Sequence, residues 1–194
     1  DVNFTLRGEL IYIWLHASIP PEKSELKSRL SSMIDITARK KAVNRLALQY
    51  DITRVLAESD GIEKPIEEII RLVCESNSWV IGEIWLVDRQ ADVLRLKSLW
   101  NKPSPDTAEF EAVSRKTSFR KGEGLPGRAW ASGQPAWISD VINDGNFLRT
   151  PAASRLGLHA AFAFPIKSSG KVIGAMSFFS QRFETPDNDF LLMF

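Results

Sequence analysis

The residues that most often carry metal and redox chemistry are scarce in this chain. Its 194 residues include two histidines, His16 and His159, and a single cysteine, Cys74. We assign the two histidines to different domains, so the sequence offers neither a paired histidine site nor a His-Cys cluster with metal-ligand spacing. We therefore expect no metal site. The single cysteine also rules out an internal disulfide.

The motifs of nucleophilic catalysis and of phosphate binding are also missing. The sequence has no Gly-x-Ser-x-Gly and no Gly-x4-Gly-Lys-Ser/Thr pattern. Gly122, Gly124 and Gly127 do match Gly-x-Gly-x-x-Gly. However, Pro126 interrupts the loop, and its predicted context is antiparallel rather than a βαβ unit. We expect no catalytic residues.

Charge and hydropathy exclude several partners. With 25 basic and 24 acidic residues, the net charge of +1 provides no field that would recruit nucleic acid or an anionic membrane. No apolar run approaches the roughly 20 residues of a membrane span, and no segment resembles a signal peptide. We expect a cytoplasmic location without direct membrane contact. The start at Asp1 suggests a fragment of a larger protein.

The second half of the chain predicts an antiparallel sheet with helices. Apolar runs at residues 159–166 and 172–179, joined by Lys-Ser-Ser-Gly-Lys, are typical of a β-hairpin at the centre of the sheet. Further strands are expected at residues 79–87 and 93–100 and around Phe119. Short helices are expected at 107–116, at 127–132 before Gly133, and at 151–156.

Two longer helices are expected before this sheet. Residues 38–57 carry one stripe of Val43, Leu46 and Tyr50 at coiled-coil spacing, and a second stripe on another face that includes Leu48. The first stripe suits a parallel homodimer, whereas packing of both stripes within one chain is the alternative. The next helix, opened by Pro65, has an apolar stripe in which Cys74 is a packing residue.

The ordered motifs of residues 122–130 (GEGLPGRAW), 137–141 (WISDV), 157–166 (GLHAAFAFPI) and 170–174 (GKVIG) resemble those of GAF domains, sensory modules of signalling proteins. The resemblance spans residues 44–194, with the C-terminal helix truncated. It implies an α+β fold: a GAF-like central antiparallel sheet with helices packed on it.

The N-terminal segment resembles a different module. Residues 10–19 and 26–36 are expected to be strands of a hairpin, and Asp35-Ile36-Thr37 followed by Ala-Arg-Lys-Lys looks like the exit of a PAS domain. We therefore expect residues 1–37 to be the C-terminal fragment of a PAS domain, with a PAS-type β-hairpin, and residues 38–57 to be a connecting signalling helix. By resemblance the parent is a bacterial sensor histidine kinase, or alternatively a cyclic-di-GMP synthase or hydrolase.

By the same resemblance, a small ligand lies between the sheet and the loops that cross it. Arg149 would pair with a carboxylate or phosphate and Asp140 would accept from a ring nitrogen or amide; a solvated loop charge and a turn cap are their ordinary alternatives. The expected ligand-binding residues are Trp100, Phe119, Leu125, Trp130, Asp140, Phe147, Arg149, Ser154, His159 and Phe162.

The resemblance also restricts the cofactor, whose identity stays open. Leu148 and Arg149 stand where a phytochrome-like GAF domain attaches its bilin to cysteine, which argues against a covalent bilin. His159 is the only candidate haem ligand in this domain, and its position suits a strand end instead. Cyclic-nucleotide motifs are only partly kept. Methionine sulfoxide reductases of this family need several cysteines.

The resulting hypothesis is a non-catalytic sensory domain in a two-component or cyclic-di-GMP signalling protein. It would bind a small molecule and relay the signal through its terminal helices to an output domain. The alternative is a ligand-free dimerisation and signal-relay module. The sequence specifies neither the ligand, nor the output domain, nor the direction of the signal.

Overall fold

A computed structural model describes residues 2–6, 9–17, 31–58 and 63–184 of the chain. It consists of two compact units, Asp1–Ala47 and Leu48–Phe194. Within the described residues no helix is both long and apolar enough to cross a membrane.

The N-terminal unit contains a three-stranded antiparallel sheet in the order β1 (Val2–Leu6), β2 (Glu9–Ala17) and β3 (Ser31–Asp35). The expected pairing of the second and third of these strands is present, with Ile13 opposite Asp35. The prediction of two strands in this unit was incomplete, because the five-residue run VNFTL is too short for its alternation to predict β1. The expected link at residues 20–25 lies outside the described residues.

Helix α1 (Thr37–Glu58) follows this sheet and matches the expected range of 38–57 within one residue at each end. The Asp35 carboxylate accepts a 2.8 Å hydrogen bond from the Thr37 N–H. That bond satisfies one free amide of the first turn. Hydrogen bonds from the Thr37 side chain and from its backbone N–H together lower the pKa of Asp35. The side chain of Asp35 therefore caps the start of α1, whose first residue is Thr37.

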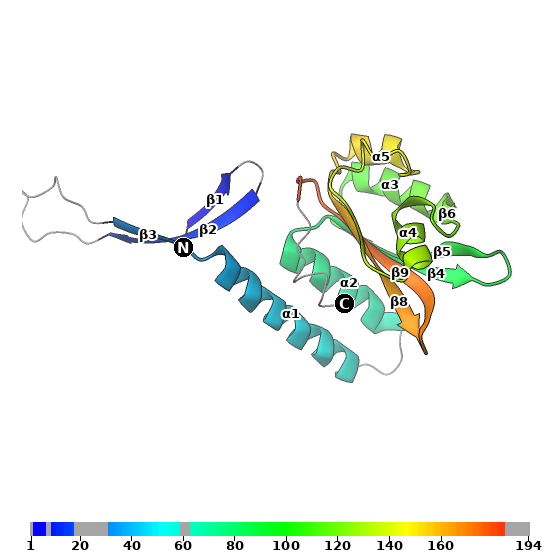
Figure 1. Ribbon diagram of the computed structural model, residues 1–194, viewed down its shortest axis with the longest axis horizontal. Coiled ribbons are helices and arrows are strands. Elements are labelled where there is room, and N and C mark those ends of the chain that lie inside the picture. Colours follow the sequence, from blue (N-terminus) through cyan, green and yellow to red (C-terminus); the bar gives the residue numbers. More distant parts are fainter. Residues whose placement is uncertain (1, 7–8, 18–30, 59–62, 185–194) are drawn as a thin grey trace, which may run out of the picture. The chain divides into compact units, whose positions relative to one another are not determined.

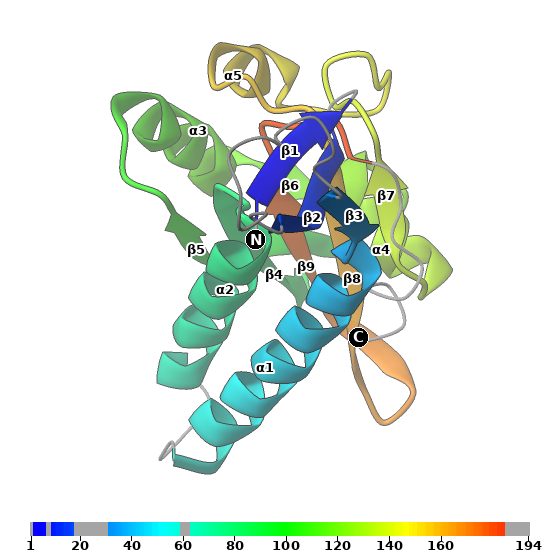
Figure 2. The ribbon, with the colours of Figure 1, turned by 90° about the vertical axis from the view of Figure 1, so that its left-hand side faces the viewer.

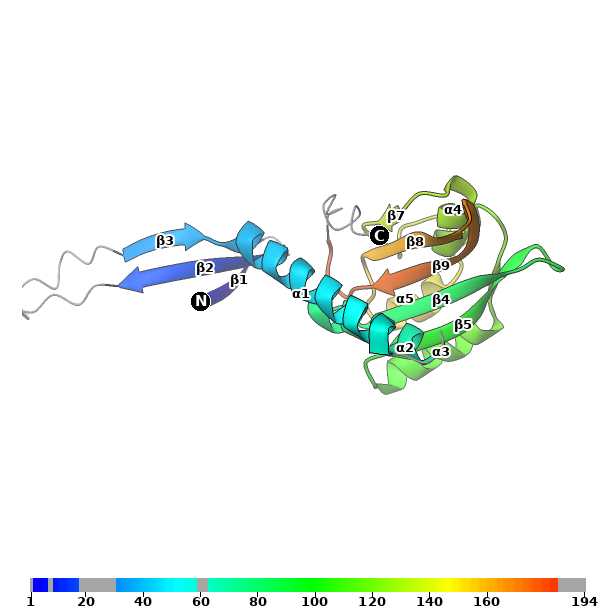
Figure 3. The same ribbon diagram turned by 90° about the horizontal axis from the view of Figure 1, so that it is seen from below.

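The second unit is built on a six-stranded antiparallel sheet in the order β6-β5-β4-β9-β8-β7. Figure 3 shows its four long strands side by side, with β4 and β9 at the centre. The expected hairpin is present, and its two strands are β8 and β9. The strands are β4 (Ile81–Asp88), β5 (Val93–Asn101), β6 (Ser118–Phe119), β7 (Ala136–Ile138), β8 (Ala161–Ser168) and β9 (Lys171–Phe179).

Helices cover both faces of this sheet (Figure 1). Helix α2 (Glu63–Asn77) lies on one face, where the second half of α1 runs beside it (Figure 2). The other face carries three shorter helices, close to their predicted positions. These are α3 (Pro105–Lys116), α4 (Gly124–Ser132) and α5 (Thr150–Arg155).

The hairpin between β8 and β9 turns on Ser169 and Gly170, both with positive φ, at 49° and 75°. Two consecutive left-handed residues are the geometry of a type I′ turn, whose twist matches that of the flanking strands. The Lys-Ser-Ser-Gly-Lys link thus makes the tight turn that its composition predicted.

Helix α4 begins three residues before the expected start at Gly127 and ends, as predicted, on the left-handed Gly133, with φ 63°. With this earlier start, Gly127 lies against the segment that directly follows β6. A Cβ at Gly127 would stand 2.3 Å from the Arg120 carbonyl oxygen. The glycine is thus required for close packing of backbone against backbone.

Candidate functional site

The two faces of β8 and β9 differ in side-chain size, except at Phe179, whose ring lies on the face with the small side chains. Alternate residues of β8 and β9 point to opposite faces, and each face carries its own buried cluster. The face covered by α3, α4 and α5 receives the small side chains Ala161, Ala163 and Ala175. The face covered by α2 receives the large side chains Phe162, Phe164, Met176 and Phe178. The small side chains bring α4 close to the sheet.

A buried ion pair lies on the face with the small side chains. The guanidinium of Arg149, from the loop before α5, binds both carboxylate oxygens of Glu83 on β4, and its Nη2 lies 3.0 Å from Oε2. Arg149 is 1% exposed and Glu83 is fully buried. Among the described residues these two are the only buried charged side chains. The pair is therefore electrically neutral within an apolar interior.

Neighbouring polar groups complete this ion pair. Trp85, two residues after Glu83 on the same face of β4, donates its indole N–H to Glu83 Oε2 at 2.9 Å. Arg149 Nη1 also donates to the hydroxyl of Ser114, from α3. Bidentate geometry and these added hydrogen bonds offset part of the cost of desolvating two charges.

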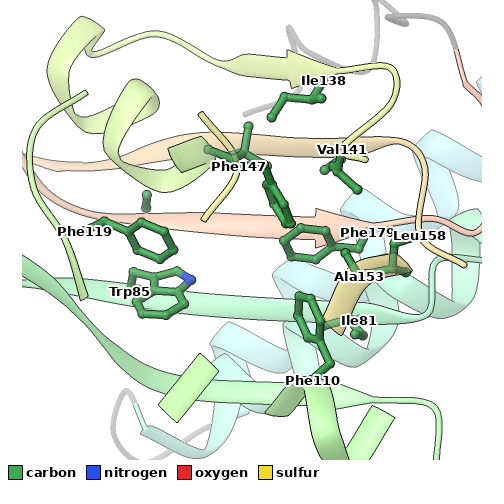
Figure 4. Packing of buried hydrophobic residues seen from close by; sticks show 14 of the residues in the cluster. Ile81, Trp85, Phe110, Phe119, Ile138, Val141, Phe147, Ala153, Leu158 and Phe179 are labelled. Atoms are coloured by element: carbon green, nitrogen blue, oxygen red, sulfur yellow. The ribbon is translucent and has the colours of Figure 1, made fainter. Parts of the chain in front are cut away.

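Five aromatic rings surround the guanidinium of Arg149. Figure 4 shows these five rings within the buried apolar cluster. Their centroids lie between 4.6 and 5.7 Å from Arg149 Cζ, within the range of cation–π attraction. The rings come from β4, α3, β6, the loop before α5, and β9. They belong to Trp85, Phe110, Phe119, Phe147 and Phe179.

The loop that carries Arg149 is anchored to α4. Arg128 donates to both carboxylate oxygens of Asp144, at 2.9 and 2.6 Å. Asn146 accepts from the Gly124 N–H at 3.2 Å and donates to the Gly122 carbonyl at 2.8 Å. The glycines that opened the predicted motif thus hold the loop through their backbone groups.

Asp140 and His159 meet at one end of the same face. His159 Nδ1 lies 3.2 Å from Asp140 Oδ1, and its ring stacks on Phe183 with centroids 3.8 Å apart. Partial burial opposes ionisation of Asp140, but hydrogen bonds from Asn143, from His159 and from the Ile142 N–H outweigh it and lower the pKa of Asp140. Asp140 is thus a turn cap as well as the partner of His159.

The chain leaves the sheet through a segment that is held at several points. The Glu184 carboxylate accepts from the Trp79 indole N–H at 3.2 Å and from the Ser180 hydroxyl at 2.8 Å. Its backbone carbonyl accepts from the Trp137 indole at 3.2 Å. Arg182 donates to the Asn77 carbonyl at the end of α2 at 3.1 Å. The exit is therefore fixed to the end of α2, to the link between α2 and β4, and to β7.

The structure brings together half of the predicted ligand-binding residues. Four of them, Phe119, Leu125, Trp130 and Phe147, are buried in the apolar cluster around the ion pair, and the fifth, Arg149, belongs to the pair itself. Arg149 is thus part of the interior, and its alternative interpretation as a solvated charge was wrong. Asp140 and His159 are partly exposed, and Ser154 is exposed on α5.

Trp100 and Phe162 do not lie with the predicted ligand-binding residues around Arg149. Both pack in the cluster against α2, on the opposite face of the sheet. For Phe162 the reason is the alternation of β8, which points its ring away from the side of Ala161 and Ala163. Neither residue can line a site shared with Arg149 without crossing the sheet.

Sequence reasoning missed Glu83, Ser114 and Ser177, which all lie at this site. One signal was available for Glu83: it is the one charged residue in the apolar run from Trp79 to Val87. A charge at that place in a central strand is rarely tolerated without a partner. Ser177, directly opposite Glu83 on β9, is also fully buried.

The residues considered for cofactors are placed as follows. Burial raises the pKa of the Cys74 thiol, which packs inside α2 against the sheet. Leu148, at the position compared with a bilin-attaching cysteine, is exposed. No group of three His, Cys, Asp or Glu side chains within the described residues could hold a metal ion.

The predicted signalling stripe lies on the outer side of α1. Leu48 is buried in the cluster against α2. The stripe residues Val43, Leu46 and Tyr50 are 55%, 67% and 70% exposed. The helix therefore has one face packed within the second unit and one apolar face open.

A curled six-stranded antiparallel sheet with helices on both faces defines an α+β domain of the GAF type. The GAF domain family matches residues 61–191. Because this range is more than half of the 194 residues, the chain belongs to the GAF domain family. The fold predicted for the second unit is thereby confirmed.

One curated relative is the Nif-specific regulatory protein of Azospirillum lipoferum, 28% identical over 131 residues. The alignment covers 66% of this chain and 20% of that protein. The chain thus spans about one fifth of the length of that relative. This similarity relates the domain to GAF domains of regulatory proteins.

Two solved structures share the fold. Free methionine-R-sulfoxide reductase from Neisseria meningitidis has a TM-score of 0.62 at 21% identity, covering 79% of this chain and 83% of that one. The nlh2 GAF domain of A. aeolicus has a TM-score of 0.60 at 23% identity, covering 78% and 86%. At these identities the likeness concerns the fold.

Proposed function

We propose that residues 48–194 form a sensory GAF domain that binds a small molecule on the sheet face carrying Glu83 and Arg149. The observation that carries the proposal is the polar cluster inside this apolar core. Replacing a buried ion pair by apolar residues is often neutral or stabilising, so packing alone does not explain its presence. A few polar groups converging among aromatic side chains are the usual chemistry of a small-molecule site.

The signal would leave the site by two routes. Phe147 and Arg149 lie on the loop that also carries Asp140. Asp140 contacts His159, and the imidazole ring of His159 stacks on Phe183. Glu184 follows at once and is fixed to Trp79. A ligand that moves the loop would therefore shift the exit segment. The second half of α1, packed beside α2, provides the other route.

We propose that the domain is regulatory and not catalytic, although one structural neighbour is a reductase. Its only cysteine, Cys74, lies on α2 and is buried against the sheet, on the face opposite to Arg149. The raised pKa of Cys74 keeps it as an unreactive thiol. Turnover of free methionine-R-sulfoxide by the purified protein with a thiol reductant would contradict this part of the proposal.

The parent protein and its location are part of the proposal. We propose a cytoplasmic bacterial sensor in which a PAS domain ends at β3 and the output is a histidine kinase, or a cyclic-di-GMP enzyme as the alternative. The regulatory relative supports a signalling role. The Asp-Ile-Thr exit at residues 35–37 and the long helix α1 support the PAS part.

The open stripe on α1 favours a second function, a ligand-free relay module that dimerises. Val43, Leu46 and Tyr50 follow one another at spacings of three and four residues, which suits a parallel helix pair. The Arg149 side chain already fills the centre of the aromatic cluster, which is also compatible with a site that takes no ligand. Both functions would use the same terminal helices.

Native mass spectrometry of the protein as purified, compared with its denatured mass, separates the two functions. A retained small molecule that is lost in Arg149→Met supports the ligand sensor and gives the mass of the ligand. A molecule retained equally by Arg149→Met must lie elsewhere. An empty dimer favours the relay module.

A further inference from the structure

Two buried polar atoms at this site have no hydrogen-bond partner within the described part of the chain. They are Arg149 Nε and Ser177 Oγ. Their side chains are 1% and 0% exposed, so bulk water does not reach them. Leaving a buried polar group unpaired is unfavourable, because the group has given up its hydrogen bonds to water. Each atom is therefore available to a bound molecule that supplies the missing partner.

The two atoms converge on Glu83. Arg149 is joined to Glu83 through both of its Nη atoms. Ser177 is paired directly with Glu83 across β4 and β9. Directly opposite residues of an antiparallel pair have Cβ atoms roughly 4.5–5.5 Å apart. The two unpaired atoms therefore lie on the same face of the sheet, on side chains that both neighbour Glu83.

The charge at this position is already balanced. Glu83 and Arg149 carry opposite unit charges and are the only buried charged side chains among the described residues. A ligand with a net charge would add an uncompensated ion to this interior. The free-energy penalty for burying such an ion remains large even after relaxation of the protein. An uncharged ligand avoids this penalty.

We infer that the site selects small uncharged molecules with a hydrogen-bond acceptor for Arg149 Nε–H and a second polar group for Ser177 Oγ, on a flat apolar body. This inference rests on the proposed sensory function and adds the chemical class of the ligand. The aromatic rings around Arg149 suit a flat body. A primary amide on an aromatic ring has these features.

In this arrangement Glu83 determines the charge selectivity of the site. Its carboxylate neutralises Arg149, which would otherwise attract anions. Replacing Glu83 by Gln keeps the size of the side chain and removes its charge. The site would then hold one uncompensated cation, and its preference should change from an uncharged ligand to an anion.

Benzamide, benzoate and benzamidine test this inference, because they are nearly isosteric and are neutral, anionic and cationic. Their affinities for the wild type, Glu83→Gln and Glu109→Gln follow from the dependence of the melting temperature on probe concentration. The wild type should bind benzamide at least about tenfold more tightly than either ion. Glu83→Gln should prefer benzoate by a similar factor. Glu109→Gln, a matched change in the exposed Arg155 ion pair, should keep the wild-type order.

Two further measurements keep the test decisive. If Glu83→Gln does not fold, Ser177→Ala should still fold and bind benzamide several-fold more weakly, because one hydrogen bond is lost. Equal or tighter binding of benzoate or benzamidine by the wild type overturns the inference and leaves the sensory function standing. An empty protein in native mass spectrometry that no probe stabilises overturns both.

Discussion

Arg149 and Glu83, 66 residues apart in the sequence, form a bidentate ion pair in the interior of the domain, on the face of the sheet covered by α3, α4 and α5. The pair joins a loop to the central strand β4. It therefore fixes the position of that loop over the sheet.

Breaking this pair from one side should be costly. Arg149→Met leaves Glu83 buried without its counter-ion, and we expect it to lower the free energy of unfolding by about 3–5 kcal/mol in urea titrations. The double variant Glu83→Leu/Arg149→Met should recover most of this loss, because no charge remains buried. Arg155→Met, which breaks the exposed pair with Glu109, should cost less than about 1 kcal/mol. A single variant as stable as the wild type would contradict the buried pair.

Gly127 should be intolerant of a side chain, in contrast to Gly145. A Cβ at Gly127 would meet the Arg120 carbonyl oxygen at 2.3 Å, whereas nothing lies within 4 Å of a Cβ at Gly145. We expect Gly127→Ala to destabilise the domain by about 1–3 kcal/mol, through overpacking against backbone. Gly145→Ala should stay within about 0.5 kcal/mol of the wild type. Thermal unfolding of the two variants measures the difference directly.

The open stripe on α1 predicts the oligomeric state. If it forms a dimer, the double variant Leu46→Glu/Tyr50→Glu should be monomeric in light scattering, because like charges would face each other at the helix seam. Gln49→Glu, at an exposed position on the same helix, is the matched control and should keep the mass of the wild type. An unchanged mass in the double variant rules out this seam.

Asp140 should contribute to stability in a pH-dependent way. Hydrogen bonds hold its pKa below the ordinary value of 3.8, so the ionised carboxylate stabilises the folded state above that pH. The contribution is lost as the pH falls through the lowered pKa. Asp140→Asn should therefore be less stable than the wild type at about pH 6, and the difference should shrink towards about pH 3. Urea unfolding at both values tests the sign. A difference that grows on acidification would contradict it.

The Glu184 carboxylate should hold the exit segment against Trp79, in the link between α2 and β4. Glu184→Ala leaves the indole N–H of Trp79 and the hydroxyl of Ser180 without this acceptor, and we expect a loss of about 1 kcal/mol. The near-ultraviolet circular dichroism of the tryptophans should weaken at the same time. Glu123→Ala, which removes an exposed contact to the Arg120 N–H, is a control that should leave this signal unchanged.

Local patterns predicted the elements of the second unit well. The apolar alternation and the Ser-Gly turn define β8 and β9, and Gly133 ends α4 as expected. These features depend on neighbouring residues, which the sequence displays directly. The short strand β1 was missed because five residues give too little periodicity.

The interior of the site was only partly predictable. Alternation alone shows that Phe162 and Ala163 face opposite sides of β8, but it does not show which side the loops cover. The partner of Arg149 could not be found by spacing, because three strands and two helices (β5, α3, β6, α4 and β7) lie between Glu83 and Arg149 in the chain. Whether a polar residue is buried depends on the whole fold, and the loop of Arg149 had the composition of a surface connection.

The unequal sizes of the side chains on the two faces of β8 and β9 bear on how such a domain diversifies. Phe164, Met176 and Phe178 bind the sheet to α2, and changes there would disturb the frame that transmits a signal. Ala163 and Ser177 contribute little volume on the opposite face. Substitutions around them therefore change the groups that a ligand would contact and leave the packing of the sheet on α2 intact. Descendants of one ancestral domain could therefore acquire new inputs through few mutations and still drive the same output.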